Sequence, residues 1–182
     1  MKQIESLLKQ GEAVQFKKSR SARKAKGVFY TPFEVIDYMV RKILEDIDLA
    51  GNPYVRILDP ACGSGLFLIK VFEVLMEKFE GDYHRISSRN KDIADKLRRE
   101  DIGRFIVENN LWGADIDSSA LNAARDSLAK LAGGKCKTNL LCCDSLVSSN
   151  REQISFFDEP SQLEEEFWRS GFDYIVGNPP YI

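Results

Sequence analysis

"YVRILDPACGSGLFLIKVFEVLMEKFE", residues 54–80, joins three different patterns in one short segment. A short apolar run comes first, a turn with Gly63 and Gly65 follows it, and a helical pattern then extends from about Ser64 to Glu80. A strand that enters a helix through a tight glycine turn is the opening of a β-α-β unit. The segment therefore predicts an α/β fold with a mostly parallel sheet.

Three further strands are predicted downstream of this unit, at residues 109–117, 137–146 and 172–181. Between the first two of these, the sequence has helical spacing, with Ser118 or Ser119 as the N-cap and Gly133 and Gly134 at the end. Asp117, which precedes the two serines, is interpreted as a cap rather than a ligand. Helices alternate with strands along the chain, as a parallel sheet requires.

Two other segments also have helical patterns. Residues 31–49, "TPFEVIDYMVRKILEDIDL", predict an amphipathic helix with Thr31 as N-cap, Pro32 at the first helical position and Glu34 three residues after the cap. Residues 81–110 are polar and longer than a simple crossover needs, so we expect an inserted helix pair there.

The composition is that of an ordinary globular protein. The chain has 182 residues, of which 43% are hydrophobic and 30% charged, with a net charge of -2. It contains neither a run long enough to cross a membrane nor a signal-peptide core, so we expect a cytoplasmic protein. Four cysteines without a C-x-x-C pair and a single histidine argue against a metal site.

The N-terminal region, residues 1–26, is predicted to be a polar helix followed by a basic linker. Residues 16–27, "FKKSRSARKAKG", carry six cations and no acid. Such a run is either a solvated arm or a segment that contacts phosphates, and the sequence leaves both interpretations open.

Polar or glycine-rich residues follow each predicted strand, where ligands bind in an open parallel sheet. They are Asp59 to Gly65, Asp115 and Asp117, Asp144, and Asn178 to Tyr181. Glycines allow close approach of the backbone, an acid after the second strand suits ribose hydroxyls, and Asp144 suits an exocyclic amine. Together these features indicate a cofactor with an adenosine group and a charged amino-acid tail.

The segments "KGVFYTP", "ILDPACGSGLFL", "GADID", "CDSL" and "GNPPYI" occur in that order. In this order they resemble the motifs of the gamma-group adenine-N6 DNA methyltransferases, and most of all the Eco57I-type branch of restriction-modification enzymes. The resemblance covers residues 27–182 and implies a Rossmann-like methyltransferase domain, S-adenosyl-L-methionine as cofactor and double-stranded DNA as substrate.

The same resemblance implies roles for individual residues. Those implied to bind the cofactor are Tyr30, Thr31 and Pro32 at its methionine end, Asp59, Ala61, Gly63 and Gly65 along methionine and ribose, Asp115 at the ribose hydroxyls, and Ile116 and Asp144 at the adenine. Those implied to be catalytic are Asn178, Pro179, Pro180 and Tyr181. The Asn178 oxygen and the Pro179 carbonyl would accept hydrogen bonds from the target amino group, and Tyr181 would stack on a flipped adenine.

The sequence departs from the family pattern after its fourth strand. The family's sheet has seven strands, so we expect an N-terminal fragment whose target recognition domain is absent and whose last strand is an exposed edge. The missing half or a specificity subunit would then be a partner, and the fragment alone would be inactive.

Two alternatives remain open at this stage. "NPPY" also occurs in methyltransferases that act on protein glutamine or on RNA, although glutamine methyltransferases resemble "DLGTGSG" where this chain has "DPACGSG". The basic run of residues 16–27 would also suit a non-catalytic DNA-associating subunit.

Overall fold

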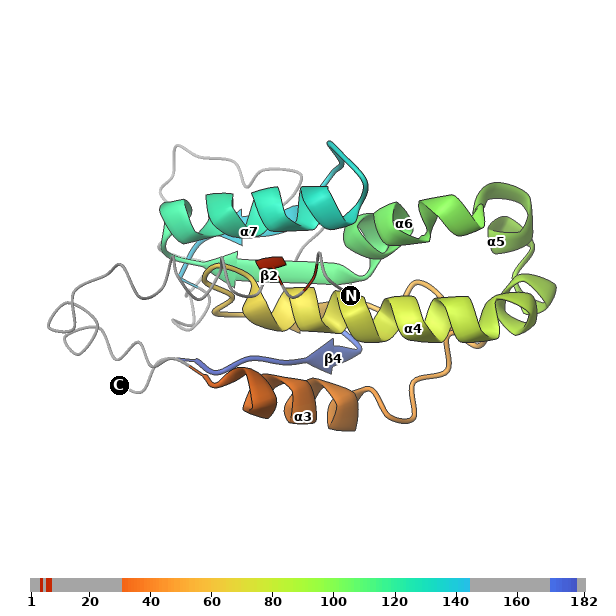
Figure 1. Cartoon of the computed structure of the whole chain (residues 1–182), viewed down its shortest axis with the longest axis horizontal. Helices are drawn as coiled ribbons and strands as arrows, with labels where there is room; N and C mark the ends of the chain where they lie inside the picture. Colours follow the sequence, from red (N-terminus) through yellow and green to blue (C-terminus); the bar gives the residue numbers. More distant parts are fainter. Residues whose placement is uncertain (1–3, 5, 8–30, 145–170, 180–182) are drawn as a thin grey trace, which may run out of the picture.

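The computed structural model describes residues 4, 6, 7, 31–144 and 171–179 (Figure 1). The described elements are, in chain order, α3 (Phe33–Ile43), β1 (Ile57–Asp59), α4 (Leu66–Arg89), α5 (Lys91–Lys96), the 3-10 helix η1 (Arg99–Asp101), α6 (Ile102–Asn109), β2 (Leu111–Asp115), α7 (Ser118–Leu131), β3 (Asn139–Cys142) and β4 (Tyr174–Ile175). The predicted α/β fold is therefore confirmed.

The four described strands form one sheet in the order β3-β2-β1-β4, and every pair is parallel. The chain moves outward from β1 to β2 and β3, and then returns to the other side of β1 to add β4. The strand order therefore reverses between β1 and β4, which is where open α/β sheets bind ligands. Among the described strands β4 is an edge, as expected, and its Ile175 is 63% exposed.

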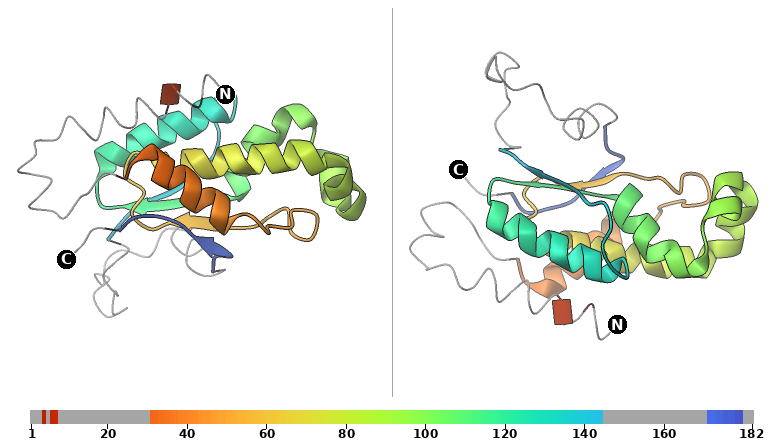
Figure 2. Two further views of the ribbon diagram at one scale, coloured as in Figure 1. Left: turned by 60° about the horizontal axis from the view of Figure 1, so that its bottom comes forward. Right: turned by 90° about the horizontal axis from the view of Figure 1, so that it is seen from above.

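The described helices α3, α4 and α7 lie on one face of the sheet (Figure 2, right). Side chains that alternate along the strands divide between two apolar clusters, because successive strand residues point to opposite faces. Ile57, Leu111 and Leu140 belong to the main core under the helices, and Leu58, Trp112, Ala114 and Leu141 form the second cluster. Both faces of the sheet are thus apolar, as is usual in parallel sheets.

Helix α3 is amphipathic, but it begins later than the sequence predicts. Ile36, Val40 and Leu44 recur every four residues and are fully buried. Pro32 is the N-cap with extended backbone, and its carbonyl accepts hydrogen bonds from the Val35 and Ile36 amides. The prediction that Thr31 caps the helix is wrong, because no side chain caps it and the Thr31 hydroxyl has a different partner.

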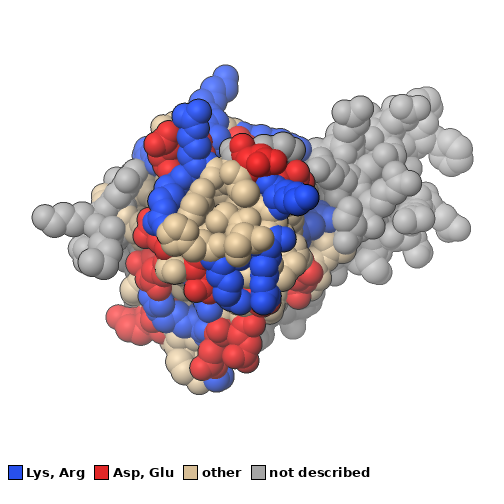
Figure 3. All heavy atoms as spheres, turned by 90° about the vertical axis from the view of Figure 1, so that its right-hand side faces the viewer, with Lys and Arg blue, Asp and Glu red and all other residues tan. Residues whose placement is uncertain are grey.

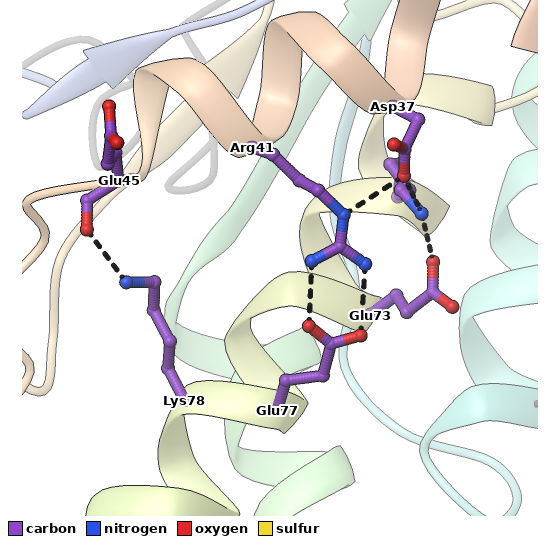
Figure 4. Close-up of polar contacts among 7 residues, drawn as sticks. Asp37, Arg41, Glu45, Glu73, Glu77 and Lys78 are labelled. Carbon is purple, nitrogen blue, oxygen red and sulfur yellow. Dashed lines mark hydrogen bonds and ion pairs between the residues drawn. The ribbon is translucent and has the colours of Figure 1, made fainter. Parts of the chain in front are cut away.

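A cluster of ion pairs and hydrogen bonds links α3 to α4 (Figure 4). Arg41 donates to both Glu77 oxygens, at 2.8 and 3.1 Å, and to Asp37 at 3.1 Å. Lys70, whose side chain is only 4% exposed, pairs with Asp37 and Glu73. Hydrogen bonding from Lys70 lowers the pKa of Asp37 although partial burial opposes it. A bidentate pair and a buried cation with two acids fix the register of the two helices.

Helix α4 continues to Arg89, well past the predicted end at Glu80. The exposed Gly81 does not break it, because Phe79 and Ile86 on either side are fully buried and hold the helix against the core. The predicted inserted helix pair is realised as the short helices α5 and α6, with η1 between them.

Helix α7 is capped by Asp117, as one of the two interpretations of this segment predicts. The Asp117 carboxylate accepts hydrogen bonds from the amides of Ser119 at 3.0 Å and Ala120 at 3.2 Å. A carboxylate at this position satisfies unpaired amides and interacts well with the helix dipole. The alternative caps, Ser118 and Ser119, are therefore wrong.

The end of the molecule formed by the distal half of α4 and by α5 lies away from the carboxyl ends of the strands (Figure 1). Its surface carries cations and acids side by side around a patch of uncharged residues and His (Figure 3). Arg85, for example, pairs with both Asp48 and Asp82. This end has no single-sign field of the kind that attracts nucleic acid.

Most of the predicted N-terminal helix and basic linker, residues 1–26, lies outside the described residues. Ile4, Ser6 and Leu7 are described, and Leu7 is 3% exposed within the main core. No helix in the described ranges is long and apolar enough to cross a membrane.

Two glycines, one directly before α4 and one within it, provide a matched test of this fold. Gly65→Ala places a side chain at a φ of +85° and 3.0 Å from the Ala124 methyl group, so we expect a loss of roughly 1–3 kcal/mol in the free energy of unfolding. Gly81→Ala adds a methyl group in open space, and we expect a gain of about 0.5–1 kcal/mol. Urea titrations measure both changes, and equal effects at the two positions would contradict the tight packing of the turn.

Candidate functional site

The turn between β1 and α4 forms the floor of the candidate site. Gly65 ends it in the left-handed region, with its amide donating to the Cys62 carbonyl at 2.8 Å. The Cys62 amide donates to the Ala114 carbonyl of β2 at 2.9 Å. The turn is therefore hydrogen-bonded to the neighbouring strand as well as to itself.

The Asp115 carboxylate joins the turn after β1 to the turn after β2. One oxygen accepts a hydrogen bond from the Gly63 amide at 2.7 Å, and the other accepts from the Asp117 amide at 2.8 Å. The Asp115 carbonyl accepts from the Cys143 amide at 3.2 Å, which brings in the turn after β3. Three strand ends thus meet at one residue that the sequence singled out as a ribose ligand.

Asp59, the last residue of β1, is a buried acid. It is 1% exposed, and one of its oxygens accepts from the Ala61 amide at 3.1 Å. Burial raises its pKa to about 7, although the hydrogen bond from Ala61 opposes the shift. Among the described residues no cation forms an ion pair with it.

The backbone of Gly177 lies against Asp59. Gly177 has a φ of +152°, and a Cβ there would come within 2.7 Å of the Asp59 carboxylate. Only glycine allows the chain after β4 to approach the acid so closely. The turn after β1 and the segment after β4 therefore meet where the strand order reverses.

Asn178 lies one residue beyond this contact. Its side-chain nitrogen Nδ2 donates a hydrogen bond to the Thr31 hydroxyl at 3.0 Å, and the two residues are 147 positions apart in the sequence. The Val176 amide, two residues earlier, donates to the Leu58 carbonyl at 2.8 Å and ties the segment to β1. Residues from the predicted "FYTP" and "NPPY" motifs are in direct contact.

The other predicted site residues differ in how they are placed. Ile116 is 70% exposed directly after Asp115, where a flat apolar group could cover it.

The remaining described site residues differ in exposure. Three are exposed, namely Pro32, Pro179 and Asp144, and two are partly exposed, namely Ala61 and Gly63. Tyr30, Pro180 and Tyr181 lie outside the described residues. Asp144 follows β3 at the far edge of the sheet from β4.

The described residues suit a cofactor that carries a positive charge and an adenosine group. Asp59 is a buried carboxylate without an ion-pair partner in the described ranges, Gly63 is partly exposed, and Ile116 presents an apolar surface. No group of three His, Cys, Asp or Glu residues among those described could hold a metal ion. The described cysteines are all free.

Sequence reasoning missed two features of this site. Gly177 was not recognised as the residue that lets the segment approach Asp59, although a glycine directly before Asn-Pro-Pro is a signal for a close backbone contact. The contact between Thr31 and Asn178 has no local signal, because it joins residues at opposite ends of the described chain.

Comparison with known proteins identifies the family. A sequence profile described as N-6 DNA Methylase matches residues 12–182. The chain belongs to the N-6 DNA methylase family. This family assignment confirms the resemblance to adenine-N6 DNA methyltransferases.

The individual relatives of this chain are much longer proteins. It is 27% identical to the adenine-specific methyltransferase PglX of Streptomyces coelicolor, over 90% of this chain and 15% of the relative. It is also 27% identical to the type II restriction enzyme and methyltransferase RM.Eco57I of Escherichia coli, over 86% of this chain and 18% of the relative. The type II methyltransferase M.VspI of Vibrio sp. is 26% identical, over 90% and 27% respectively.

The chain therefore spans less than a third of each of these relatives. A solved structure with a similar fold is the ATP-dependent type ISP restriction-modification enzyme LlaBIII bound to DNA, with a TM-score of 0.58 and 22% sequence identity. The match covers 96% of this chain and 12% of that one. This similarity supports the α/β fold of the chain.

The buried acid gives a prediction for stability against pH. The folded-state pKa of Asp59 is about 7 and its ordinary value is 3.8, so folding takes up a proton between these values. Stability should fall as the pH rises from about 4 to about 7 and stay low above it. Asp59→Asn keeps an acceptor for Ala61 and removes the charge, so it should stabilise the protein at pH 8, by on the order of a few kcal/mol, but not at pH 4.

Thermal unfolding followed from pH 4 to pH 8 measures this difference. Asp126→Asn, which neutralises an exposed acid on α7, is the control for an equal change of charge away from the site. Parallel pH profiles for the wild type and Asp59→Asn would show that the Asp59 carboxyl is not perturbed.

Proposed function

We propose that this chain carries the cofactor-binding and acceptor-binding parts of a DNA adenine-N6 methyltransferase of a restriction-modification system. The observation that carries the proposal is the hydrogen bond from Asn178 to Thr31, which joins the two motifs expected at the acceptor and at the cofactor. Membership of the N-6 DNA methylase family supports the acceptor class.

S-adenosyl-L-methionine is the proposed cofactor, and when bound it supplies a methyl group on a sulfonium. Asp59 contributes the negative potential of a buried carboxylate to a cationic ligand, and Gly63 and Gly65 allow close backbone contact. Asp115 binds ribose hydroxyls while its carboxylate holds the Gly63 and Asp117 amides. Ile116 covers one face of the adenine ring, and Asp144 accepts from its amino group.

The acceptor chemistry needs hydrogen-bond acceptors rather than a strong base. The amino group of adenine is planar and carries two protons, and its nitrogen lone pair is delocalised into the ring. The Asn178 side-chain oxygen and the Pro179 carbonyl accept hydrogen bonds from its two N–H groups, which returns electron density to the nitrogen that receives the methyl group. Tyr181 stacks on the base once it leaves the duplex.

The two alternatives from the sequence are weaker. Methyl transfer to protein glutamine or to RNA would use the same acceptors, but the family match is to DNA methylases. A non-catalytic DNA-associating role would need no contact between Asn178 and the cofactor motif, yet that contact is made. Salt-dependent DNA binding without cofactor binding would favour the non-catalytic role.

Cofactor binding by the 182-residue chain is the first test of this proposal. Calorimetric titration with S-adenosyl-L-methionine should give saturable binding, weakened by roughly 1–3 kcal/mol in Asp115→Ala through loss of charged hydrogen bonds. Asp117→Ala is the control, since it removes the cap of α7 but leaves the Asp115 carboxylate in place. Equal affinity of wild type and Asp115→Ala would reject Asp115 as a ribose ligand, and no binding by the folded wild type would reject a self-sufficient cofactor site.

Asn178→Ala tests the acceptor half of the site separately. In the native protein, we expect methyl transfer to DNA to fall by at least about 100-fold, the scale for removing one preorganised hydrogen-bonding group. The dissociation constant for S-adenosyl-L-methionine should stay within about threefold of the wild type, because one neutral hydrogen bond at most is affected. Loss of cofactor binding instead would contradict the role given to Asn178.

A further inference from the structure

The Asn178 carboxamide can adopt two orientations of almost the same shape, related by exchange of its oxygen and its NH2 group. In one, its oxygen faces the acceptor, and in the other its NH2 group does. An adenine amino group presents two donors, so only the first orientation gives a hydrogen bond. In the structure the NH2 group of Asn178 faces the protein, which leaves the side-chain oxygen toward the acceptor.

The hydrogen-bond partner of this NH2 group is the Thr31 hydroxyl. It accepts from the Asn178 amide nitrogen at 3.0 Å in a partly buried setting. Among the described residues no group donates to the Asn178 side-chain oxygen, which is thus kept for a ligand. Because Pro32 rather than Thr31 caps α3, the hydroxyl is not used by the first turn of the helix.

We propose that Thr31 is a positioning residue, whose hydroxyl holds the Asn178 carboxamide with its oxygen toward the acceptor amine. The inference rests on the proposed methyltransferase function and deepens it. It gives Thr31 a role toward the acceptor, whereas the family resemblance assigns it to the methionine end of the cofactor. Thr31 acts through Asn178 and takes part in no bond-making step.

The position of Thr31 is itself fixed by the charge cluster between α3 and α4. Lys70 pairs with Asp37 in the first turn and a half of α3 and lies 5.1 Å from the ring centre of Phe33, two residues after Thr31. One helical turn beyond Asp37, Arg41 is bound to Glu77 of α4 (Figure 4). Helix α4 starts at the glycine turn of the cofactor site, so the cluster ties the Thr31 hydroxyl to the same helix.

The closing experiment compares Thr31→Val, which keeps the shape without the hydroxyl, with Thr31→Ser, which keeps the hydroxyl. In the native protein, we expect the single-turnover rate of methyl transfer to fall about threefold to tenfold in Thr31→Val, as for loss of one hydrogen bond, and to return to near the wild-type rate in Thr31→Ser. Dissociation constants for S-adenosyl-L-methionine and DNA should stay within twofold in both.

Three results would overturn the proposal. These are a wild-type rate in Thr31→Val, an equal defect in both variants, and a defect that appears only as weaker cofactor binding. The last result would return Thr31 to the methionine end of the cofactor. If the wild type itself transfers no methyl group to DNA, the proposed function fails, and the positioning role is then judged by the next measurement.

That measurement follows the Asn178 side-chain amide protons by NMR in the 182-residue chain, with assignment by their disappearance in Asn178→Ala. They should exchange with water more slowly in the wild type and in Thr31→Ser than in Thr31→Val, because one proton is hydrogen-bonded to the hydroxyl. Equal exchange in all three would show that Thr31 does not hold the carboxamide, whatever the catalytic result.

Discussion

Two backbone amides, those of Gly63 and Asp117, converge on the Asp115 carboxylate, and this pair of hydrogen bonds organises the carboxyl edge of the sheet. Each amide belongs to a turn that starts a helix, α4 in one case and α7 in the other. Holding both turns on one side chain sets the two helices in register, and Gly65 then allows the first turn to pack on Ala124. A loop held in this way has little conformational freedom left to lose when a ligand binds.

The elements around this edge could be predicted because their signals are local. The strand, glycine turn and helix of residues 54–80 follow one another directly, and the acids at the strand ends follow apolar runs. The parallel sheet follows from the alternation of strands with helices. Asp117 could be recognised as a cap from its place just before a helical pattern, since capping depends on the next three residues.

Other features depend on distant partners, and the sequence carried no signal for them. Thr31 matches an N-cap pattern, but its hydroxyl bonds to Asn178, far away in the chain. Helix α4 passes Gly81 because Phe79 and Ile86 are held by the core, which outweighs the low helix propensity of one glycine. The place of β4 beside β1 likewise depends on tertiary packing. The site is therefore predictable in its parts but not in how α3 and β4 join.

Strand β4 has a consequence for how the site forms. It is only two residues long. The Asp173 side chain just before it accepts a hydrogen bond from the Arg56 amide, 117 positions earlier in the chain. By contrast, Gly63 and Asp115, which join the turns after β1 and β2, are 52 positions apart. Closing the longer loop costs more chain entropy, and few backbone hydrogen bonds repay it. The segment with Asn178 is therefore expected to pair with β1 late in folding. The part of the sheet that is proposed to bind a cofactor and the part that is proposed to use it would then form at different stages of folding.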